Sequence, residues 1–318
     1  MRYEEKRWIM LCASIMMNIC IGAGYAWSVF QKPLIQLYQW TPADTALAFT
    51  LIMGISALPM ALVGKSQQYI PPKTIILVGG LLFGLGIFFT GYISTLAGLY
   101  ILYGVVAGIG TGIVYSGGVA NMLRFFPDKR GLCAGLLAGG MGSGALVIAP
   151  LAAQLIDAYG VMNAFKILGI GFTVIIAGLS FVIDTAPADF KPQGWSNSRM
   201  NATAAGVEKD YKQMLKDPIF YVIAGIFVTG TMSGLMIIAH ASSILQEIIN
   251  VTPQQAAAMV GMISLVNALG RVGWGYISDQ IGRLTTTLIL YLISVVSVLG
   301  LTVVPDSGFF YLILLVGA

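Results

Sequence analysis

The chain has 318 residues, of which 57% are hydrophobic and 9% are charged, and its formal net charge is +4 at pH 7. A water-soluble domain carries a larger share of charged residues, so this composition excludes an ordinary soluble protein and predicts that most of the chain faces lipid. The basic residues are scattered between apolar segments and form no basic face, which argues against a nucleic acid as partner.

Apolar stretches of the length that a helix needs to cross a bilayer recur along the chain. Six occur in the first part, at residues 8–30, 42–64, 74–94, 96–123, 131–156 and 161–183. A polar segment with five basic residues then interrupts the pattern at residues 184–218 and is interpreted as a cytoplasmic linker. Four more stretches follow, at residues 219–245, 253–277, 285–304 and 309–318. The sequence therefore predicts an all-α polytopic membrane protein with about ten helices.

The distribution of lysine and arginine predicts the orientation of these spans. If the amino terminus is cytoplasmic, 14 of the 17 basic residues fall in inner segments, and the outer segments hold only Lys32 and Lys166, with Arg271 inside a span. Short cytoplasmic loops keep an excess of basic residues. We therefore expect a multi-pass protein of the plasma (inner) membrane with a cytoplasmic amino terminus.

A displacement of 211 residues relates the two parts of the chain. It carries Trp8 onto Ile219 and Thr74 onto Thr285, where corresponding spans open. This agreement predicts two parallel, pseudo-symmetric bundles: residues 1–183 as an N-terminal six-helix bundle, 184–218 as the linker, and 219–318 as a C-terminal bundle. Spans five and six have no counterpart in the second part, so the C-terminal bundle is expected to be incomplete.

A charged segment after the eighth span resembles the signature of major facilitator proteins. It begins at Gly275, has Asp279 four residues on, and ends in Gly282 and Arg283. An aspartate there can cap a helix or pair with a cation, and the glycines allow a tight turn against a neighbouring helix. We predict that these four residues form a gate in the loop between two spans. The alternative is a charged turn with no such role.

Further stretches carry a closer resemblance: Gly24–Phe30, Tyr115, Phe126–Gly131, Gly140–Pro150 and Asn267–Arg271. Together they resemble the oxalate/formate antiporter family within the major facilitator superfamily, and the likeness extends over nearly the whole chain. The resemblance implies a major facilitator fold and a secondary transporter that exchanges small carboxylate anions by alternating access. The same family includes carriers assigned to lactate, pyruvate and other monocarboxylates.

Arg271 is the one basic residue predicted toward the middle of a span. A charge near the middle of a membrane helix costs about 2.5–3.5 kcal/mol on insertion scales, so such a residue usually faces a partner or a water-filled path. Its planar guanidinium can hold a carboxylate through two parallel hydrogen bonds. The family resemblance implies that this arginine binds the carboxylate of the substrate. The alternative is that its side chain extends toward the inner membrane surface.

Three further side chains are candidates for the transport site. The resemblance places Tyr25 and Tyr115 on cavity-facing helices, where their hydroxyl groups could donate to an anion, although aromatic residues in spans also serve in packing. His240 is the only histidine of the chain. It could take part in proton coupling, or it could be a polar packing residue.

The acidic residues bear on the transport mode. All 13 can be placed in loops or at span ends, which leaves no buried carboxylate as a proton relay and favours anion exchange. The alternatives are a proton-coupled monocarboxylate symporter, and a membrane sensor or an inactive fragment. No enzymatic constellation and no cofactor or metal site is recognisable. We expect a monomer in the lipid bilayer, with small carboxylates as its partners and no nucleic acid.

Overall fold

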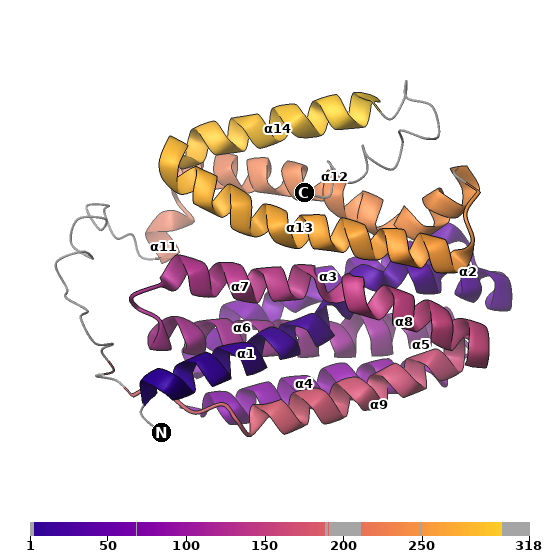
Figure 1. Ribbon diagram of the computed structural model, residues 1–318, viewed down its shortest axis with the longest axis horizontal. Helices are drawn as coiled ribbons and strands as arrows, with labels where there is room; N and C mark the ends of the chain where they lie inside the picture. The colour runs from indigo at the N-terminus through magenta and orange to yellow at the C-terminus, as the bar shows by residue number, and fades with distance from the viewer. Residues whose placement is uncertain (1–2, 68, 188–189, 191–210, 249, 301–318) are drawn as a thin grey trace.

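The computed structural model describes residues 3–67, 69–187, 190, 211–248 and 250–300, and the regular structure in this part of the chain is helical. Figure 1 shows most of the helices lying side by side along one axis. Eight helices among the described residues are long and apolar enough to cross a membrane. The prediction of an all-α polytopic membrane protein is therefore confirmed.

The first span, Glu4–Tyr38, is broken near its middle. It consists of α1 (Tyr3–Ile21), a short 3-10 segment η1 (Gly22–Ala26) and α2 (Trp27–Tyr38). Glycine is a weak helix former, and Gly22 also lies so close to a neighbouring helix that an added Cβ atom would be 2.2 Å from the carbonyl oxygen of Met141. The helix does not end at Phe30, the predicted end of this span, because α2 continues to Tyr38, and Lys32 lies in that helix.

The other five spans of the first part of the chain are confirmed, with ends that differ from the predicted ones by a few residues. Lys166 lies within the last of them and not in a loop. The elements are α3 (Pro42–Ser66), α4 (Pro72–Thr90), α5 (Leu96–Leu99), the π-helical segment η2 (Tyr100–Val106), α6 (Ala107–Phe125), α7 (Arg130–Gly142), α8 (Gly144–Tyr159) and α9 (Val161–Ser180). We call the helices from α1 to α9 the first bundle.

The second part of the chain contains α11 (Tyr211–Met214), α12 (Pro218–Ile248), α13 (Pro253–Ile281) and α14 (Arg283–Gly300). Here α12 and α13 are long enough to span, whereas the apolar part of α14 is shorter. Of the ten predicted spans, eight are full-length helices and the ninth is a shorter helix within the described part of the chain. The predicted tenth span, at residues 309–318, lies outside the described residues.

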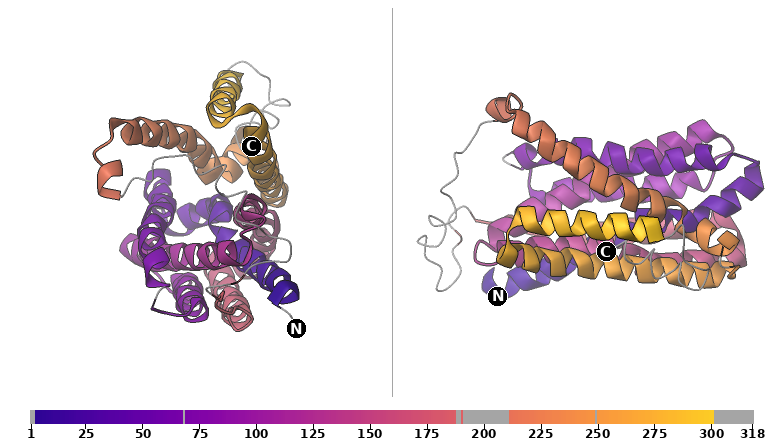
Figure 2. Two further views of the ribbon diagram at one scale, coloured as in Figure 1. Left: turned by 90° about the vertical axis from the view of Figure 1, so that its left-hand side faces the viewer. Right: turned by 90° about the horizontal axis from the view of Figure 1, so that it is seen from above.

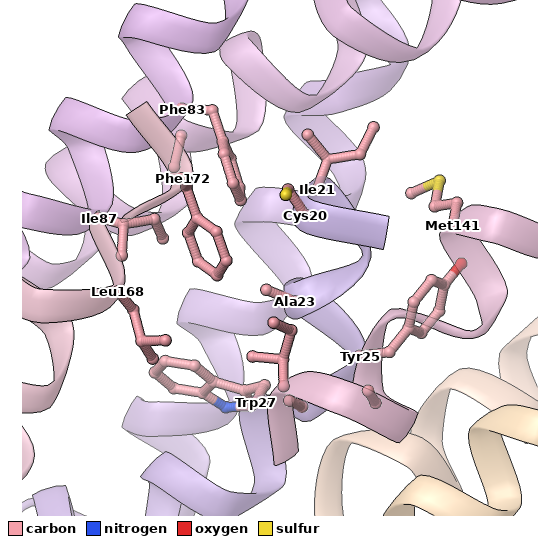
Figure 3. Close-up of a cluster of buried hydrophobic side chains, with 14 of the residues drawn as sticks. Cys20, Ile21, Ala23, Tyr25, Trp27, Phe83, Ile87, Met141, Leu168 and Phe172 are labelled. Atoms are coloured by element: carbon pink, nitrogen blue, oxygen red, sulfur yellow. The ribbon is translucent and has the colours of Figure 1, made fainter. Parts of the chain in front are cut away.

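The hydrophobic core of the first bundle surrounds the broken first span. Trp27 is fully buried and its ring lies 4.5 Å from that of Tyr103. Figure 3 shows Trp27 beside Leu168, with Phe83 and Phe172 farther along the same cluster. These large side chains fix the position of η1, and therefore the place where the first span bends.

A buried charge pair ties the start of α1 to the connection between α6 and α7. Arg7, with 8% of its surface exposed, donates to Asp128 at 2.8 and 3.3 Å and to the carbonyl oxygen of Phe125 at 3.3 Å. Its guanidinium carbon also lies 4.7 Å from the ring centroid of Phe126, within cation–π range. The Phe126–Gly131 stretch noted in the sequence is therefore held against α1.

The second part of the chain meets the first bundle mainly through α13, which lies along α7 and α8 (Figure 1). Small residues permit this approach: a Cβ atom on Gly261 would lie 3.3 Å from the backbone of Leu146. The hydroxyl group of Ser264 donates to the carbonyl oxygen of Gly142. Figure 2 shows that α12 instead crosses obliquely, and its later half packs on α2.

Candidate functional site

Arg271 reaches from α13 across the interface to the first bundle. Its Nη1 donates to the carbonyl oxygen of Ala138 in α7 at 3.1 Å, and its Nη2 donates to the hydroxyl oxygen of Tyr25 at 3.1 Å. The guanidinium carbon lies 5.7 Å from the Tyr25 ring centroid. The side chain thus points into the protein, and the alternative orientation along the helix toward the membrane surface is not adopted.

The charge of Arg271 has no counter-charge in the described part of the chain. No carboxylate lies within 4.0 Å of it there, and both acceptors of its hydrogen bonds are neutral. A guanidinium away from water is costly unless an opposite charge compensates it. The arrangement is therefore suited to an anion that comes from outside the protein.

Tyr25 owes its position to the break in the first span. It lies in η1, is 9% exposed, and in Figure 3 its hydroxyl group points away from Phe83 and Phe172 and toward the side of Met141. Tyr115, on α6, is near enough to interact electrostatically with both Tyr25 and Arg271. The structure brings the three predicted substrate-binding residues together, and their role in binding stays a prediction.

A small cavity adjoins this cluster where η1, α7, α8, α12 and α13 meet. Tyr25, Gly142, Ser264 and Asn267 line it together with aliphatic side chains. Its volume of about 10 Å³ is near the lower limit for a single water molecule. This cavity is therefore too small for a carboxylate, which could occupy it only if α12 and α13 moved relative to the first bundle.

The sequence analysis missed Ser264, Asn267 and Gly142 as site residues. Ser264 and Asn267 precede Arg271 by seven and four positions, which places all three on one face of α13. Polar residues at helical spacing in an otherwise apolar helix were the available signal. Gly142 gives no comparable signal, although an added Cβ atom there would lie 3.4 Å from Nε of Arg271.

The predicted gate differs from expectation in its local structure. Gly275 and Asp279 lie in α13, which continues as a helix to Ile281. The turn is Gly282, with φ +89°, and Arg283 begins α14. The predicted loop from Gly275 to Arg283 is therefore wrong, because hydrogen bonding continues the helix beyond the apolar part of the span. The gating role of these residues stays a prediction.

His240 lies away from the Arg271 cluster. It is on α12, and its Nδ1 is 3.2 Å from Oε1 of Gln31 on α2. It does not line the small cavity, although its neighbours Ile238 and Ala241 do. The structure therefore does not place the only histidine at the predicted anion site.

Comparison with known proteins identifies the family. The model of the Major Facilitator Superfamily matches residues 8–318. The chain is 30% identical over 307 residues to the uncharacterized MFS-type transporter YhjX of Escherichia coli K12, covering 95% of this chain and 74% of that protein. It is 29% identical over 293 residues to the oxalate:formate antiporter of Oxalobacter formigenes, covering 91% and 68%.

A solved structure shows the same fold. The inward-facing, unoccupied crystal structure of a bacterial homologue of the human lysosomal transporter Spinster aligns with a TM-score of 0.72, at 15% identity, over 98% of this chain and 72% of that one. Together with the membrane-spanning helices and the family match over residues 8–318, this likeness leads to one conclusion: the chain belongs to the Major Facilitator Superfamily.

Proposed function

We propose that this protein is a secondary active transporter that exchanges small carboxylate anions across the membrane by alternating access. The observation that carries the proposal is the guanidinium of Arg271, which crosses the interface to the first bundle with no carboxylate partner among the described residues. The name of one relative, an oxalate:formate antiporter, supports the substrate class.

In the proposed binding step, the substrate carboxylate replaces a protein group as the hydrogen-bond acceptor of Arg271. A carboxylate entering beside Arg271 takes the place of the Ala138 carbonyl oxygen and accepts two parallel hydrogen bonds from the guanidinium. The hydroxyl groups of Tyr25 and Tyr115 then donate to the anion. Because Arg271 belongs to α13 and both tyrosines to the first bundle, one small ligand contacts both sides of the interface and stabilises a closed, loaded state.

The charge of Arg271 also accounts for the exchange of one anion for another. When the site is empty and closed, two neutral acceptors compensate the guanidinium only in part, so closing without an anion is energetically costly. A loaded carrier therefore changes sides more readily than an empty one, and one anion leaves as another enters. A proton-coupled symporter is the rival mode, and it would lose uptake when the pH gradient is collapsed.

The remaining parts of the proposal concern the gate and the placement in the cell. Gly275, Asp279, Gly282 and Arg283 would control access at the end of α13 where it turns into α14. We place the protein in the plasma (inner) membrane as a monomer, and the distribution of its basic residues supports a cytoplasmic amino terminus.

The test is counterflow in proteoliposomes preloaded with oxalate, with labelled oxalate or formate outside and no pH gradient. Truncating one partner of a desolvated charge pair costs about 2–5 kcal/mol, so Arg271→Gln should lower uptake roughly 30-fold or more. Arg271→Lys keeps the charge without the planar fork and should retain little activity. Lys166→Gln, which removes a cation from α9 away from the cluster, is the matched control.

Two outcomes would change the conclusion. Uptake by Arg271→Gln at the level of the Lys166→Gln control would refute the assignment of the site. Uptake by the unmodified protein that disappears when the pH gradient is collapsed would replace exchange by proton-coupled symport, with the site unchanged.

A further inference from the structure

A second and larger cavity lies between α2, the beginning of α3, α12 and α14. Its volume is about 590 Å³, which is within the range of small-molecule sites. It shares no lining residue with the small cavity at Arg271. Its polar lining consists of Gln31, Lys32, Gln36, His240, Ser243 and Glu247.

Hydrogen bonds at the wall of this cavity fix the proton on His240. The buried amide of Gln31 donates through Nε2 to the carbonyl oxygen of Pro42 at 3.3 Å and to Oγ1 of Thr45 at 3.2 Å. A carbonyl oxygen only accepts, so this pairing orients the amide and leaves Oε1 as the acceptor for His240 Nδ1 at 3.2 Å. Nδ1 therefore carries a proton, and a second proton can only be taken up at Nε2.

The charges that face His240 favour an anion once that second proton is bound. On α2, Lys32 lines the same cavity and has no ion pair within the described part of the chain. On α12, Glu247 is exposed and seven residues from His240, about 10 Å along the helix. The beginning of α3 contributes Pro42 and α14 contributes Val298 to the lining, both without charge. The carboxylate of Asp44 is held by Thr41.

We propose that this cavity is a second carboxylate-binding site, in which an anion lies between the ammonium group of Lys32 and the doubly protonated ring of His240. Gln36 and Ser243 supply further hydrogen-bonding groups from the same two helices. The site is separate from Arg271 and does not depend on the function proposed above. The anion needs the proton at Nε2 of His240, so acidic solution favours binding.

Proton linkage gives the expected size of the effect. Because the anion binds a ring with both nitrogens protonated, binding of the anion takes up one proton at Nε2. Binding that takes up one proton weakens by up to about tenfold for each unit by which the pH rises. Lys32 contributes its ammonium group to the anion independently of that proton, so Lys32→Gln should weaken binding at both acidic and neutral pH.

The first test is equilibrium binding of labelled oxalate to the purified full chain at pH 5.5 and 7.5. Arg271→Gln removes the central cation and leaves the second cavity intact. In that background, binding should persist at pH 5.5, be weaker at pH 7.5, and be lost in Lys32→Gln or His240→Gln. Lys166→Gln is the control for loss of an unrelated cation. Thermal unfolding in detergent verifies that each variant is folded.

A second measurement needs no substitution at the site. Diethyl pyrocarbonate modifies unprotonated histidine rings, and His240 is the only histidine of the chain, so mass spectrometry reports on this side chain alone. Oxalate should slow the modification, whereas chloride at equal ionic strength should not.

The outcomes separate the two proposals. Loss of all oxalate binding in Arg271→Gln, with no protection of His240 in the unmodified protein, would overturn the second site and leave the first proposal standing. If both sites exist, Arg271→Gln should bind one oxalate fewer than the unmodified protein. An unchanged number of bound oxalates in Arg271→Gln, with all binding lost in His240→Gln, would support the second site and refute the role of Arg271.

Discussion

The first span contacts the junction between α7 and α8, which together form the fifth span, and this contact can be tested by adding one methyl group. A Cβ atom at Gly144 would lie 2.5 Å from the Cα and carbonyl carbon atoms of Gly22. These are backbone atoms with no side chain to rotate away, so Gly144→Ala must push two helices apart. Overpacking of this kind costs about 1–3 kcal/mol. Alanine also favours a helix over glycine by up to about 1 kcal/mol, which would mask part of that cost.

Gly171→Ala is the matched control, because it makes the same exchange within α9 at a position with nothing within 4 Å of the added atom. The difference between the two variants removes the helix-propensity gain and leaves the cost of the contact, about 2 kcal/mol. For a chain of 318 residues, that corresponds to a gap of roughly 3 °C in melting temperature. Thermal unfolding of both variants in the same detergent measures it. A Gly144→Ala protein that melts at or above the temperature of Gly171→Ala would refute the reasoning.

Three other predictions concern the charge pair, the tyrosine and the topology. Asp128→Asn leaves Arg7, which is 8% exposed, without its counter-charge and should lower the free energy of unfolding by about 2–3 kcal/mol. Asp184→Asn breaks the pair with Lys6, whose side chains are 37% and 43% exposed, and should lower it by no more than about 1 kcal/mol. Thermal unfolding of the two variants measures the difference. Tyr25→Phe removes one hydroxyl group beside Arg271, and counterflow kinetics should show a KM several-fold higher with protein levels unchanged. Alkaline phosphatase inserted at Gln39, between α2 and α3, should be active, since a cytoplasmic amino terminus puts this turn outside; an inactive fusion there would reverse the topology.

The sequence predicted the spans well because hydropathy measures how the chain partitions into the bilayer. It predicted their ends less well, since a helix ends where its hydrogen bonding ends. The first span was expected to end at Phe30, yet α2 continues through Gln31 and Lys32. The segment after Gly275 was expected to be a loop, yet α13 continues to Ile281. In both places polar residues marked the limit of the apolar span and not of the helix.

The candidate site was predicted in part. Arg271 stood out as a charge in a span, and Tyr25 came from a resemblance that the geometry supports with a 3.1 Å hydrogen bond. The hydrogen bond from Arg271 to the carbonyl oxygen of Ala138 could not be predicted, because every residue has a main-chain carbonyl group and the sequence does not show which one is used. The bond between His240 and Gln31 joins residues 209 positions apart, and only the packing of α12 on α2 brings them together.

A single residue, Gly282, joins α13 to α14, and its backbone is in the left-handed region, with φ +89°. Any other residue except asparagine or aspartate would pay about 1–2 kcal/mol for this conformation. A joint this short has almost no slack, so a tilt of α13 must be passed on to α14. The first turn of α14 is therefore displaced whenever a ligand at Arg271 moves the end of α13, although no residue of α14 lines the cavity beside Arg271.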